Sequence, residues 1–234
     1  FDRGANIRGA ADAPGLIYKS LLDSCFPADH VVVNNNSNAF QVLSDTYFET
    51  YRALDAGYAV CTMGGDHAVA IGSVAAANDH SRSARQKLGV VWIDAHADFN
   101  TPETSPTQNV HGMVVSILCG HCLSPLHFGF GLESYQFAYF GLRDIDSLEL
   151  SRMQEYNMTV LDSITDLSSW VEQFDVLHVS FDMDCLDPSF MPSVNTPVPN
   201  GLTIEQIDSI FEIVKKSDKL LSLDIVEFNP LLNS

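Results

Sequence analysis

Carboxylate and imidazole side chains gather in two short segments that each follow an apolar run. The segment WIDAHAD carries Asp94, His96 and Asp98 at every second position, a spacing that in an extended chain directs all three side chains to the same side. The segment VSFDMD repeats this spacing with Asp182 and Asp184. Side chains of these types ligate metal ions and transfer protons, so the two segments are the first candidates for a site of chemistry.

Two more segments place a titratable side chain near the end of an apolar run. GGDH has His67 two residues after a pair of glycines, where backbone can approach closely, and LDIVEF has Glu227. A lone aspartate at such a place usually caps a helix or turn, and a lone histidine is usually a satisfied polar group. Several acids and histidines in two segments are a different case, because unpaired charge buried beside apolar neighbours costs several kcal/mol. Metal ions would remove that cost.

The donor types indicate which metal such a site would prefer. The candidate ligands are His67, Asp94, His96, Asp98, Asp182 and Asp184. This oxygen-rich set needs no thiolate and favours Mn²⁺ over structural zinc, while ligand type alone leaves Fe, Co and Ni open. Six ligands with two carboxylates able to bridge suggest two ions roughly 3.5 to 4 Å apart, a spacing that activates one water between them. Hydrolysis is therefore the reaction class that we expect.

The elements that position these segments follow a βα rhythm from Tyr58 onward. Runs such as LGVVWI and VLHVSF are apolar at nearly every position, as strands are when helices cover both faces of a parallel sheet. We therefore predict an α/β fold, a three-layer αβα sandwich with a central, mainly parallel sheet. Ligands bind beyond the carboxyl ends of the strands in such sheets, which is where the candidate residues lie. The segments predicted to form strands are 58–65, 88–98, 137–144, 176–184 and 219–228, and the predicted helices are 67–79, 111–120, 147–157 and 203–216.

Two local signals mark boundaries of these elements. Thr203 with Gln206 three residues later forms a capping-box pattern ahead of an apolar stripe, which predicts that a helix starts at Thr203. The stretch NNNSN at 34–38 is typical of a solvated loop.

Length and composition predict one domain over residues 1–234. The chain is 46% hydrophobic, which is enough for a sizeable core. Its 30 acidic and 12 basic residues give a formal net charge of −18, which makes nucleic acid and membranes improbable partners. A cationic substrate or metal cations fit this charge better.

Cysteine usage and hydropathy predict a cytoplasmic protein. Five cysteines, an odd number spread through the chain, do not form a disulfide framework. No run reaches the roughly 18 to 20 apolar residues that span a bilayer, and the first residues lack the apolar segment of a signal peptide. Because the chain starts with Phe1 and stops seven residues after Glu227, we expect native terminal segments to be missing from 1–234.

Five blocks of the chain are similar, in order, to the signature blocks of the ureohydrolase (arginase/agmatinase) family, and most similar to those of its arginases. The resemblance spans nearly the whole chain and implies an arginase-like fold with two manganese ions per chain. It also implies a homo-oligomer, either a trimer or a hexamer. The blocks are GGDHAVAIGS (64–73), DAHADFNTPETSPTQNVHGM (94–113), GLRDIDSLE (141–149), SFDMDCLDPSFMP (180–192) and DIVEFNP (224–230).

The resemblance implies roles for the metal ligands and for three further residues. One ion would be held by His67, Asp94, Asp98 and Asp182, and the other by Asp94, His96, Asp182 and Asp184. The implied reaction converts L-arginine to L-ornithine and urea by attack of a metal-bridging hydroxide, which donates a hydrogen bond to Asp98. In the family pattern His111 is the proton shuttle, Glu227 pairs with the guanidinium group and Thr196 lies beside it.

The family positions that contact the amino-acid end of arginine are filled by polar residues. Asn100, Thr107 and Asn109 match those that address the α-carboxylate, and Asp146 and Glu149 those at the α-ammonium. Two departures bear on specificity: Thr107 replaces a usual serine, and Gln108 replaces a usual glycine and restricts the backbone of the loop.

Three alternatives stay open. The first is a ureohydrolase for agmatine, guanidinobutyrate or formiminoglutamate, and the second is a non-catalytic protein that binds arginine or metal. The third is a thiol-redox protein, because 119–122 spells the CGHC of disulfide isomerases. A redox pair needs a helix that opens at its first cysteine, whereas Cys119 follows a segment that we predict to be a helix ending at Gly120.

Overall fold

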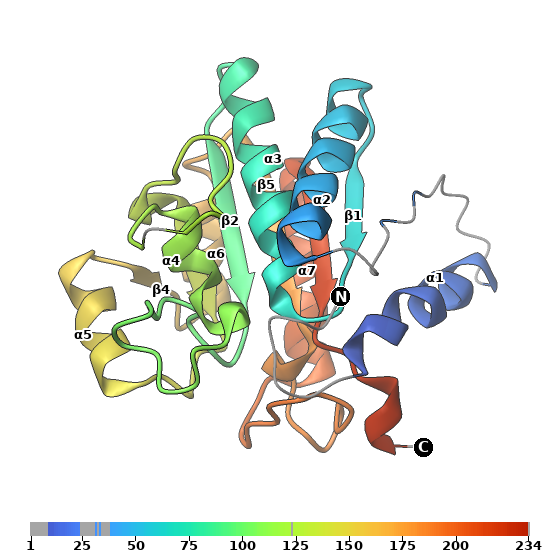
Figure 1. The fold of residues 1–234 in the computed structure, drawn as a ribbon, viewed down its shortest axis with the longest axis vertical. Coiled ribbons are helices and arrows are strands. Elements are labelled where there is room, and N and C mark those ends of the chain that lie inside the picture. Colours follow the sequence, from blue (N-terminus) through green and yellow to red (C-terminus); the bar gives the residue numbers. More distant parts are fainter. Residues whose placement is uncertain (1–8, 24–30, 32, 34–37, 123, 234) are drawn as a thin grey trace.

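The computed structural model describes residues 9–23, 31, 33, 38–122 and 124–233. In this part of the chain, six strands form one sheet in the order β1-β6-β5-β2-β3-β4, and every neighbouring pair is parallel (Figure 1). The strands are β1 (Val60–Met63), β2 (Leu88–Ile93), β3 (Phe137–Phe140), β4 (Thr159–Val160), β5 (Val176–Asp182) and β6 (Leu220–Val226). The five predicted strands are confirmed, and the two-residue β4 is an addition.

Seven α-helices lie in the same described part. They are α1 (Ala13–Asp23), α2 (Ala39–Asp55), α3 (Ala70–Ser83), α4 (Val114–Leu118), α5 (Ser147–Glu155), α6 (Ile164–Val171) and α7 (Ile204–Ser217). Short 3-10 helices are η1 (Ala10–Asp12), η2 (His67–Val69), η3 (Val110–Met113), η4 (Ser134–Gln136), η5 (Met183–Cys185) and η6 (Pro230–Asn233). None of the described helices is both long and apolar enough to cross a membrane.

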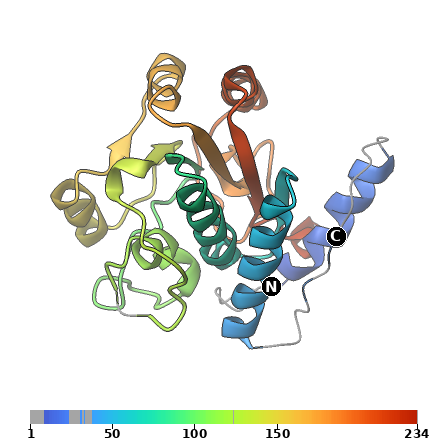
Figure 2. The same ribbon diagram turned by 90° about the horizontal axis from the view of Figure 1, so that it is seen from above.

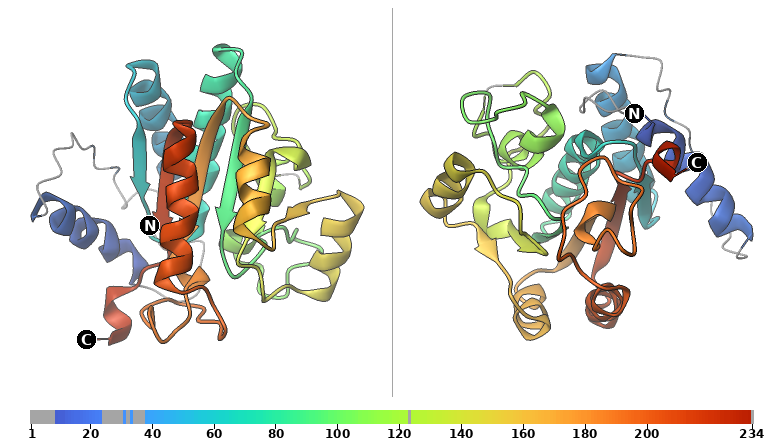
Figure 3. Two further views of the ribbon diagram at one scale, coloured as in Figure 1. Left: turned by 180° about the vertical axis from the view of Figure 1, so that it is seen from behind. Right: turned by 90° about the horizontal axis from the view of Figure 1, so that it is seen from below.

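The helices cover both faces of the sheet, which confirms the predicted three-layer αβα architecture. Helices α6 and α7 lie on one face, and α2, α3 and α4 lie on the other (Figures 2 and 3). All six residues of β2 are buried: Val90 and Trp92 pack toward α3 and α4, whereas Val91 and Ile93 pack toward α6 and α7. Each fully buried aliphatic side chain of this kind contributes about 1.5–3 kcal/mol.

The start of α7 has the predicted capping box. The backbone N–H of Gln206 donates to Thr203 Oγ1 (3.3 Å), and the backbone N–H of Thr203 donates to Gln206 Oε1 (2.9 Å). The helix then buries Ile207, Ile210 and Val214 against the sheet. A cap of this type is worth about 1 kcal/mol.

The predicted NNNSN loop lies outside the described residues except for Asn38. The side chain of Asn38 accepts a hydrogen bond from the backbone N–H of Gln41 (2.9 Å) and caps α2. This residue therefore starts a helix in addition to ending the polar stretch.

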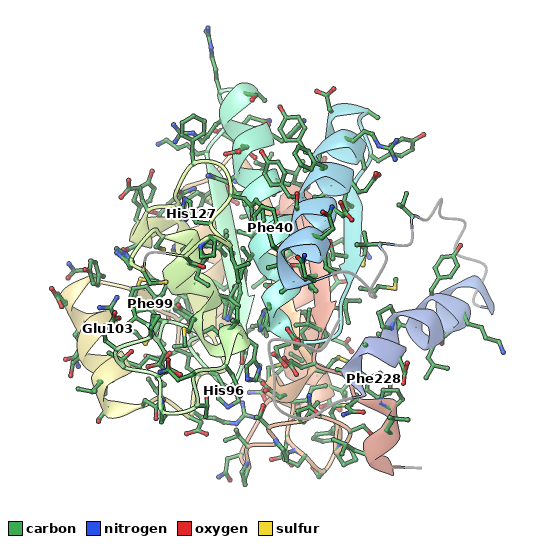
Figure 4. The ribbon with its side chains drawn as sticks, viewed as in Figure 1. Phe40, His96, Phe99, Glu103, His127 and Phe228 are labelled. Atoms are coloured by element: carbon green, nitrogen blue, oxygen red, sulfur yellow. The ribbon has the colours of Figure 1, made fainter. Side chains whose placement is uncertain are left out.

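The carboxyl ends of the strands open toward one edge of the sheet, the lower edge in Figure 1. The loops after β1, β2, β5 and β6 carry the candidate residues to this edge, and His96 is labelled there in Figure 4. Parallel pairing thus gathers segments that are more than a hundred residues apart in the sequence.

Candidate active site and metal centre

His67 directs one ring nitrogen at three carboxylates. Its Nδ1 lies 3.1 Å from Asp94 Oδ2, 3.1 Å from Asp98 Oδ2 and 3.0 Å from Asp182 Oδ2. All four side chains are buried. One N–H cannot satisfy three carboxylates, so this arrangement has more acceptors than donors.

The ring of His67 is held in place by groups on two strands. Its Nε2 forms a hydrogen bond with Ser180 Oγ on β5 (2.8 Å), and its face stacks on Trp92 of β2 with centroids 4.2 Å apart. The chain that leads from β1 to His67 requires glycine at position 64, because a Cβ there would lie 2.4 Å from Val69 Cγ2. Nδ1 is therefore left to face the carboxylates.

His96 forms the second half of the centre. Its Nδ1 lies 3.1 Å from Asp184 Oδ2 and 3.5 Å from Asp94 Oδ1, while its Nε2 lies 3.7 Å from Asp144 Oδ2. Asp94 therefore faces both histidines and links the two halves.

The ligands converge by tight turns, so the expectation that an extended chain aligns them is wrong. Strand β2 ends at Ile93, the chain bends over residues 94–96, and Asp98 has φ +50°. Asp94 Oδ1 accepts a hydrogen bond from the backbone N–H of His96 (2.7 Å), and Asp182 Oδ1 accepts one from that of Asp184 (2.7 Å) in η5. Such turns fold acids back on their own backbone and direct the remaining oxygens inward.

The carboxylates perturb one another's titration. Burial, together with the nearby Asp94, raises the pKa of Asp98 to about 6. Burial and the neighbouring Asp184 and Asp94 raise the pKa of Asp182. Burial opposes charge on His96 as well, but its contacts with Asp184 and Asp94 prevail and raise its pKa to about 12. The cluster thus carries more negative charge than its own imidazoles neutralise.

The residues fit divalent metal ions. Donor atoms of His67, Asp94 and Asp98 lie within 4.8 Å of one another, and so do those of Asp94, His96 and Asp184. Among the described residues, His67 Nδ1 and Asp98 Oδ2 are buried with no hydrogen-bond partner. Oxygen-rich donors at this spacing, with unpartnered atoms aimed inward, are what a hard or borderline divalent cation requires.

Glu227 and His111 lie together beside this centre. His111 Nδ1 is 3.2 Å from Glu227 Oε1, which also accepts a hydrogen bond from the backbone N–H of His67 (2.8 Å). Glu227 follows β6 with φ +64° and is 1% exposed. Burial tends to lower the pKa of His111, but the Glu227 carboxylate outweighs burial and raises it.

A cavity of about 190 Å³ joins these groups. This volume is below that of pockets for drug-sized ligands and suits a single small metabolite. Five of the six candidate metal ligands line it, and the sixth, Asp94, is buried behind the lining residues that it contacts, His67 and His96. His111 and six of the residues predicted to contact the substrate also line it: Asn100, Thr107, Asp146, Glu149, Thr196 and Glu227.

Asn109 is the predicted substrate contact that does not line the cavity. It is half-buried, and its backbone N–H donates to Thr107 Oγ1 (3.3 Å). Thr196, placed beside Glu227 in the family pattern, donates its hydroxyl to Asp184 Oδ2 (2.9 Å). In this structure it therefore orients a candidate metal ligand.

Glu149 and Asp146 join the lining of the cavity to the start of α5. Glu149 Oε1 accepts from the backbone N–H of Phe99 (2.7 Å), and its Oε2 accepts from that of Asp146 (3.4 Å). Asp146 Oδ2 accepts from Asn100 Nδ2 (3.0 Å). Burial raises the pKa of Glu149 to about 7 against the effect of the Phe99 N–H. Glu149 therefore holds two backbone segments together, in addition to lining the cavity.

Three residues at the site were missed from the sequence: Ser180, Asp144 and Arg143. Ser180 precedes Asp182 on the same strand, and Asp144 sits inside the block GLRDIDSLE, so both adjoin recognised motifs. The guanidinium group of Arg143 donates to six main-chain carbonyls, one of which belongs to the candidate ligand Asp184. These carbonyls belong to Gly141, Asp184, Cys185, Leu186, Val198 and Pro199.

The CGHC segment does not have the geometry of a redox pair. Helix α4 ends at Leu118, Cys119 caps its C-terminus, and no described helix begins there. Both cysteines are free, and burial raises the pKa of Cys119 to about 12. A raised pKa disfavours the thiolate on which thiol exchange depends.

Comparison with known proteins gives a consistent result. The model of the Arginase family matches residues 8–234. The arginase of Coccidioides posadasii is 34% identical over 221 residues, a match that covers 85% of this chain and 66% of that protein. The chain therefore spans slightly less than two thirds of the length of this relative.

Two solved structures are similar over almost the whole chain. The arginase of Bacillus subtilis has a TM-score of 0.87 at 26% identity and covers 100% of this chain and 89% of its own. The arginase of Entamoeba histolytica in complex with L-ornithine has a TM-score of 0.86 at 26% identity and covers 99% of this chain and 89% of its own.

Proposed function

The chain belongs to the arginase family, and from this membership and the site geometry we propose that it is a manganese-dependent hydrolase that converts L-arginine to L-ornithine and urea. The observation that carries the proposal is the convergence on one cavity of two His–Asp groups suited to metal ions with a buried glutamate suited to a guanidinium group. The relatives named above are arginases, which supports L-arginine over other guanidines.

The metal would be two Mn²⁺ ions per chain. One would be held by His67, Asp94, Asp98 and Asp182, and the other by Asp94, His96, Asp182 and Asp184, with Asp94 and Asp182 shared. When bound, the ions would neutralise the carboxylates and supply an activated water for hydrolysis. The buried, unpartnered His67 Nδ1 and Asp98 Oδ2 support this assignment.

Glu227 would bind the guanidinium group of the substrate. A carboxylate grips this planar cation with two charge-assisted hydrogen bonds, and such bonds are strongest where water is excluded. Its Oε1 is fixed by the His67 N–H, while Oε2 has, among the described residues, one long contact, with Asn195 Nδ2 (3.4 Å). Glu227 therefore keeps acceptor capacity for a ligand. The net charge of −18 would favour entry of a cation.

His111 would supply the proton that the leaving amine needs. It lines the cavity, its Nδ1 faces Glu227, and its side chain is 18% exposed, so it reaches both substrate and solvent. The raised pKa keeps a proton on this ring at a pH where a free imidazole has lost it.

The amino-acid end of arginine would lie at the opposite end of the cavity. Asp146 would pair with the α-ammonium group, and Glu149 would hold the Asp146 backbone in position. Asn100 and Thr107 line the cavity where they could contact the α-carboxylate. A direct contact from Asn109, a single domain over 1–234, a cytoplasmic location, a homo-oligomer and the absence of nucleic-acid or membrane partners stay predictions.

Urea release by the purified, Mn-loaded chain tests the proposal. We expect urea from L-arginine in preference to agmatine, with about two Mn²⁺ per chain by elemental analysis. A preference for agmatine would contradict the substrate assignment. Arginine binding without urea release would instead establish a non-catalytic binding protein.

Two substitutions separate metal binding from proton transfer. His111→Ala should keep its Mn²⁺ and lose about 100- to 10,000-fold in kcat, the usual share of a general acid. Asp182→Ala should lose both metal and activity. His127, labelled in Figure 4, bonds the carbonyl of Ile117 outside the cavity, so His127→Ala is the matched control and should keep both. Full activity in His111→Ala would exclude its proposed role.

A further inference from the structure

Gln108 adopts a backbone conformation that favours glycine. Its φ is +61°, in the left-handed region, which a residue with a branched or long side chain adopts only at a cost. Its side chain is at the surface, so burial of apolar atoms does not compensate for this cost. Some other interaction must hold the residue in this conformation.

Hydrogen bonds from Gln108 supply that interaction. Its side-chain Nε2 donates to the carbonyl of Pro102 (2.8 Å) and to the carbonyl of Ser105 (2.7 Å), which uses both amide hydrogens. Its backbone N–H donates to Ser105 Oγ (3.0 Å). One residue thus closes the loop between β2 and η3 onto itself. We call these three hydrogen bonds the Gln108 clasp.

The clasp adjoins the wall of the cavity. Ser105, Pro106 and Thr107 line the cavity, and they lie between the two ends of the clasp. Glu103 of the same loop is exposed, and Figure 4 labels it on the outer side of the molecule. The loop therefore has one side toward solvent and one side toward the ligand.

Further hydrogen bonds connect the loop at the Gln108 clasp to Asn100 and Asp146. The backbone N–H of Ser105 donates to the carbonyl of Thr101 (2.8 Å). The hydroxyl of Thr104 donates to Asn100 Oδ1 (2.8 Å), and Asn100 Nδ2 donates to Asp146 (3.0 Å). Fixing the outer part of the loop therefore fixes the amide of Asn100, which lines the cavity.

We propose that Gln108 is a positioning residue for the amino-acid end of the substrate, because its amide pre-orders the loop that carries Ser105, Pro106 and Thr107. This inference rests on the proposed function, which places the α-carboxylate at this loop. A loop that is ordered before binding does not lose conformational freedom on binding, so the ligand keeps more of its interaction free energy. Glu227 lies after β6 and does not depend on the clasp, so recognition of the guanidinium group should not change.

The test compares substrates and loop dynamics in Gln108→Met, which keeps the side-chain length and removes both donors. We expect KM for L-arginine to rise about tenfold with kcat changed less than about twofold, since two hydrogen bonds of ordinary strength are lost. The inhibition constant of agmatine, which lacks the α-carboxylate, should stay within about twofold. In the metal-free protein, hydrogen exchange at residues 105–108 should become faster than in the unaltered chain.

Two glycine variants separate the clasp from backbone strain. Gln108→Gly accepts the positive φ without cost but lacks the amide, so it should raise KM as Gln108→Met does. Arg85 has φ +59° outside the cavity, so Arg85→Gly relieves the same strain elsewhere and should leave KM and exchange at 105–108 unchanged. If Gln108→Gly kept the unaltered KM, strain rather than the amide would be the relevant property and the inference would be wrong.

The remaining outcomes each decide one part. Unchanged exchange at 105–108 in Gln108→Met would show that no clasp orders the loop. Faster exchange with equal losses for arginine and agmatine would overturn the role in reading the amino-acid end. If the unaltered chain released no urea from L-arginine, the proposed function would fail together with the substrate part of this inference, whereas the exchange measurement would still decide whether the clasp exists.

Discussion

His67 and His178 are both at most 1% exposed, and each has a ring nitrogen 3.0 Å from an oxygen of a buried aspartate. Around His67, one nitrogen faces three carboxylates and has no hydrogen bond of acceptable geometry. Around His178, Nδ1 bonds Ser222 Oγ (2.8 Å) and Nε2 bonds Asp224 Oδ2 (3.0 Å). The residue types and the burial are the same, but the number of acids per imidazole is not.

The group around His178 has one acid for one imidazole, although Asp224 Oδ1 has no hydrogen-bond partner among the described residues. The group joins β5, β6 and α3, because Ser73 Oγ on α3 also donates to Asp224 Oδ2 (2.8 Å). Asp224 Oδ2 therefore bonds one imidazole and one hydroxyl, and the Ser222 hydroxyl bonds the other ring nitrogen of His178.

By contrast, the group at the carboxyl edge of the sheet gathers four aspartates around two imidazoles. Burial and neighbouring carboxylates raise the pKa of Asp98 and Asp182, whereas His67 and His96 outweigh burial and lower the pKa of Asp94. Excess acid at a buried site, rather than the presence of His–Asp contacts, therefore distinguishes a metal centre from a structural pair.

Metal-loaded protein should show the largest contrast between the two groups. Asp182→Asn removes a shared ligand and should reduce urea production by more than about a thousandfold with loss of bound Mn²⁺, because changes outside the ligand shell already cost 10- to 100-fold. Asp224→Asn should keep its Mn²⁺ content at a temperature where it is folded. Elemental analysis and urea assay measure both. Loss of metal from Asp224→Asn alone would reverse the assignment of the two groups.

Without metal, the same two substitutions should change stability in opposite directions. Asp182→Asn relieves repulsion in the open cluster, so we expect the free energy of unfolding to rise by about 1 kcal/mol. Asp224→Asn removes the carboxylate beside the buried His178 and should lower the free energy of unfolding by about 3 kcal/mol. Urea unfolding in the presence of a chelator measures both. Equal destabilisation by the two variants would show that the open cluster is not strained by its own charge.

Glu149 is an intermediate case, a buried acid that accepts hydrogen bonds from two backbone N–H groups and forms no ion pair with the residues that the structure describes. Its folded pKa of about 7 lies above the ordinary value of 4.5. Between these values the folded protein binds a proton that the unfolded chain has released, so the free energy of unfolding falls as pH rises through this window. The decrease reaches about 3 kcal/mol at pH 7.

Glu149→Gln removes that titration. Between pH 4.5 and 7, the free energy of unfolding of the chelator-treated wild-type protein should therefore fall by up to about 3 kcal/mol more than that of Glu149→Gln. Unfolding curves at several pH values measure the difference. Parallel pH profiles for the two proteins would mean that the carboxylate of Glu149 is not destabilised by burial.

Sequence reasoning predicted the elements whose pattern is local. The continuous apolar run of β2 and the capping box of Thr203 each specify an element without reference to distant residues. Strand β4 was missed because two residues give no period, and it exists through its pairing with β3. Helix α6 was missed although its start signal is local: Ser163 caps the helix, and Asp166 lies three residues later and accepts a hydrogen bond from the Ser163 hydroxyl (2.6 Å).

The site was predictable in residue type but not in geometry. The clustering of acids indicated a metal centre, but the turn at Asp98 with φ +50° depends on packing that no spacing rule contains. Arg143 could not be identified because its hydrogen-bond partners among the described residues are main-chain carbonyls, which every residue has. The serine hydroxyls that bond His67 and His178 could not be predicted either, because these contacts depend on which strands become neighbours in the sheet.

Two serines offer the smallest and most closely matched test of the comparison. Ser180 Oγ bonds His67 Nε2 at 2.8 Å, and Ser222 Oγ bonds His178 Nδ1 at 2.8 Å. Both hydroxyls are buried, and each orients one imidazole. Replacement by alanine removes the same group from each site, so any difference in outcome reports what each histidine does.

Ser180→Ala should weaken Mn²⁺ binding about tenfold, because a ligand histidine depends on the partner of its other nitrogen for orientation and basicity. Ser222→Ala should leave Mn²⁺ affinity unchanged and lower the free energy of unfolding by about 1–2 kcal/mol, because it leaves a buried ring nitrogen without a partner. Metal titration and urea unfolding of both variants give the four values needed. If Ser222→Ala weakened metal binding as much as Ser180→Ala did, the two groups would have to be coupled through β5, and the acid-to-imidazole ratio would no longer distinguish the proposed metal centre from the group around His178.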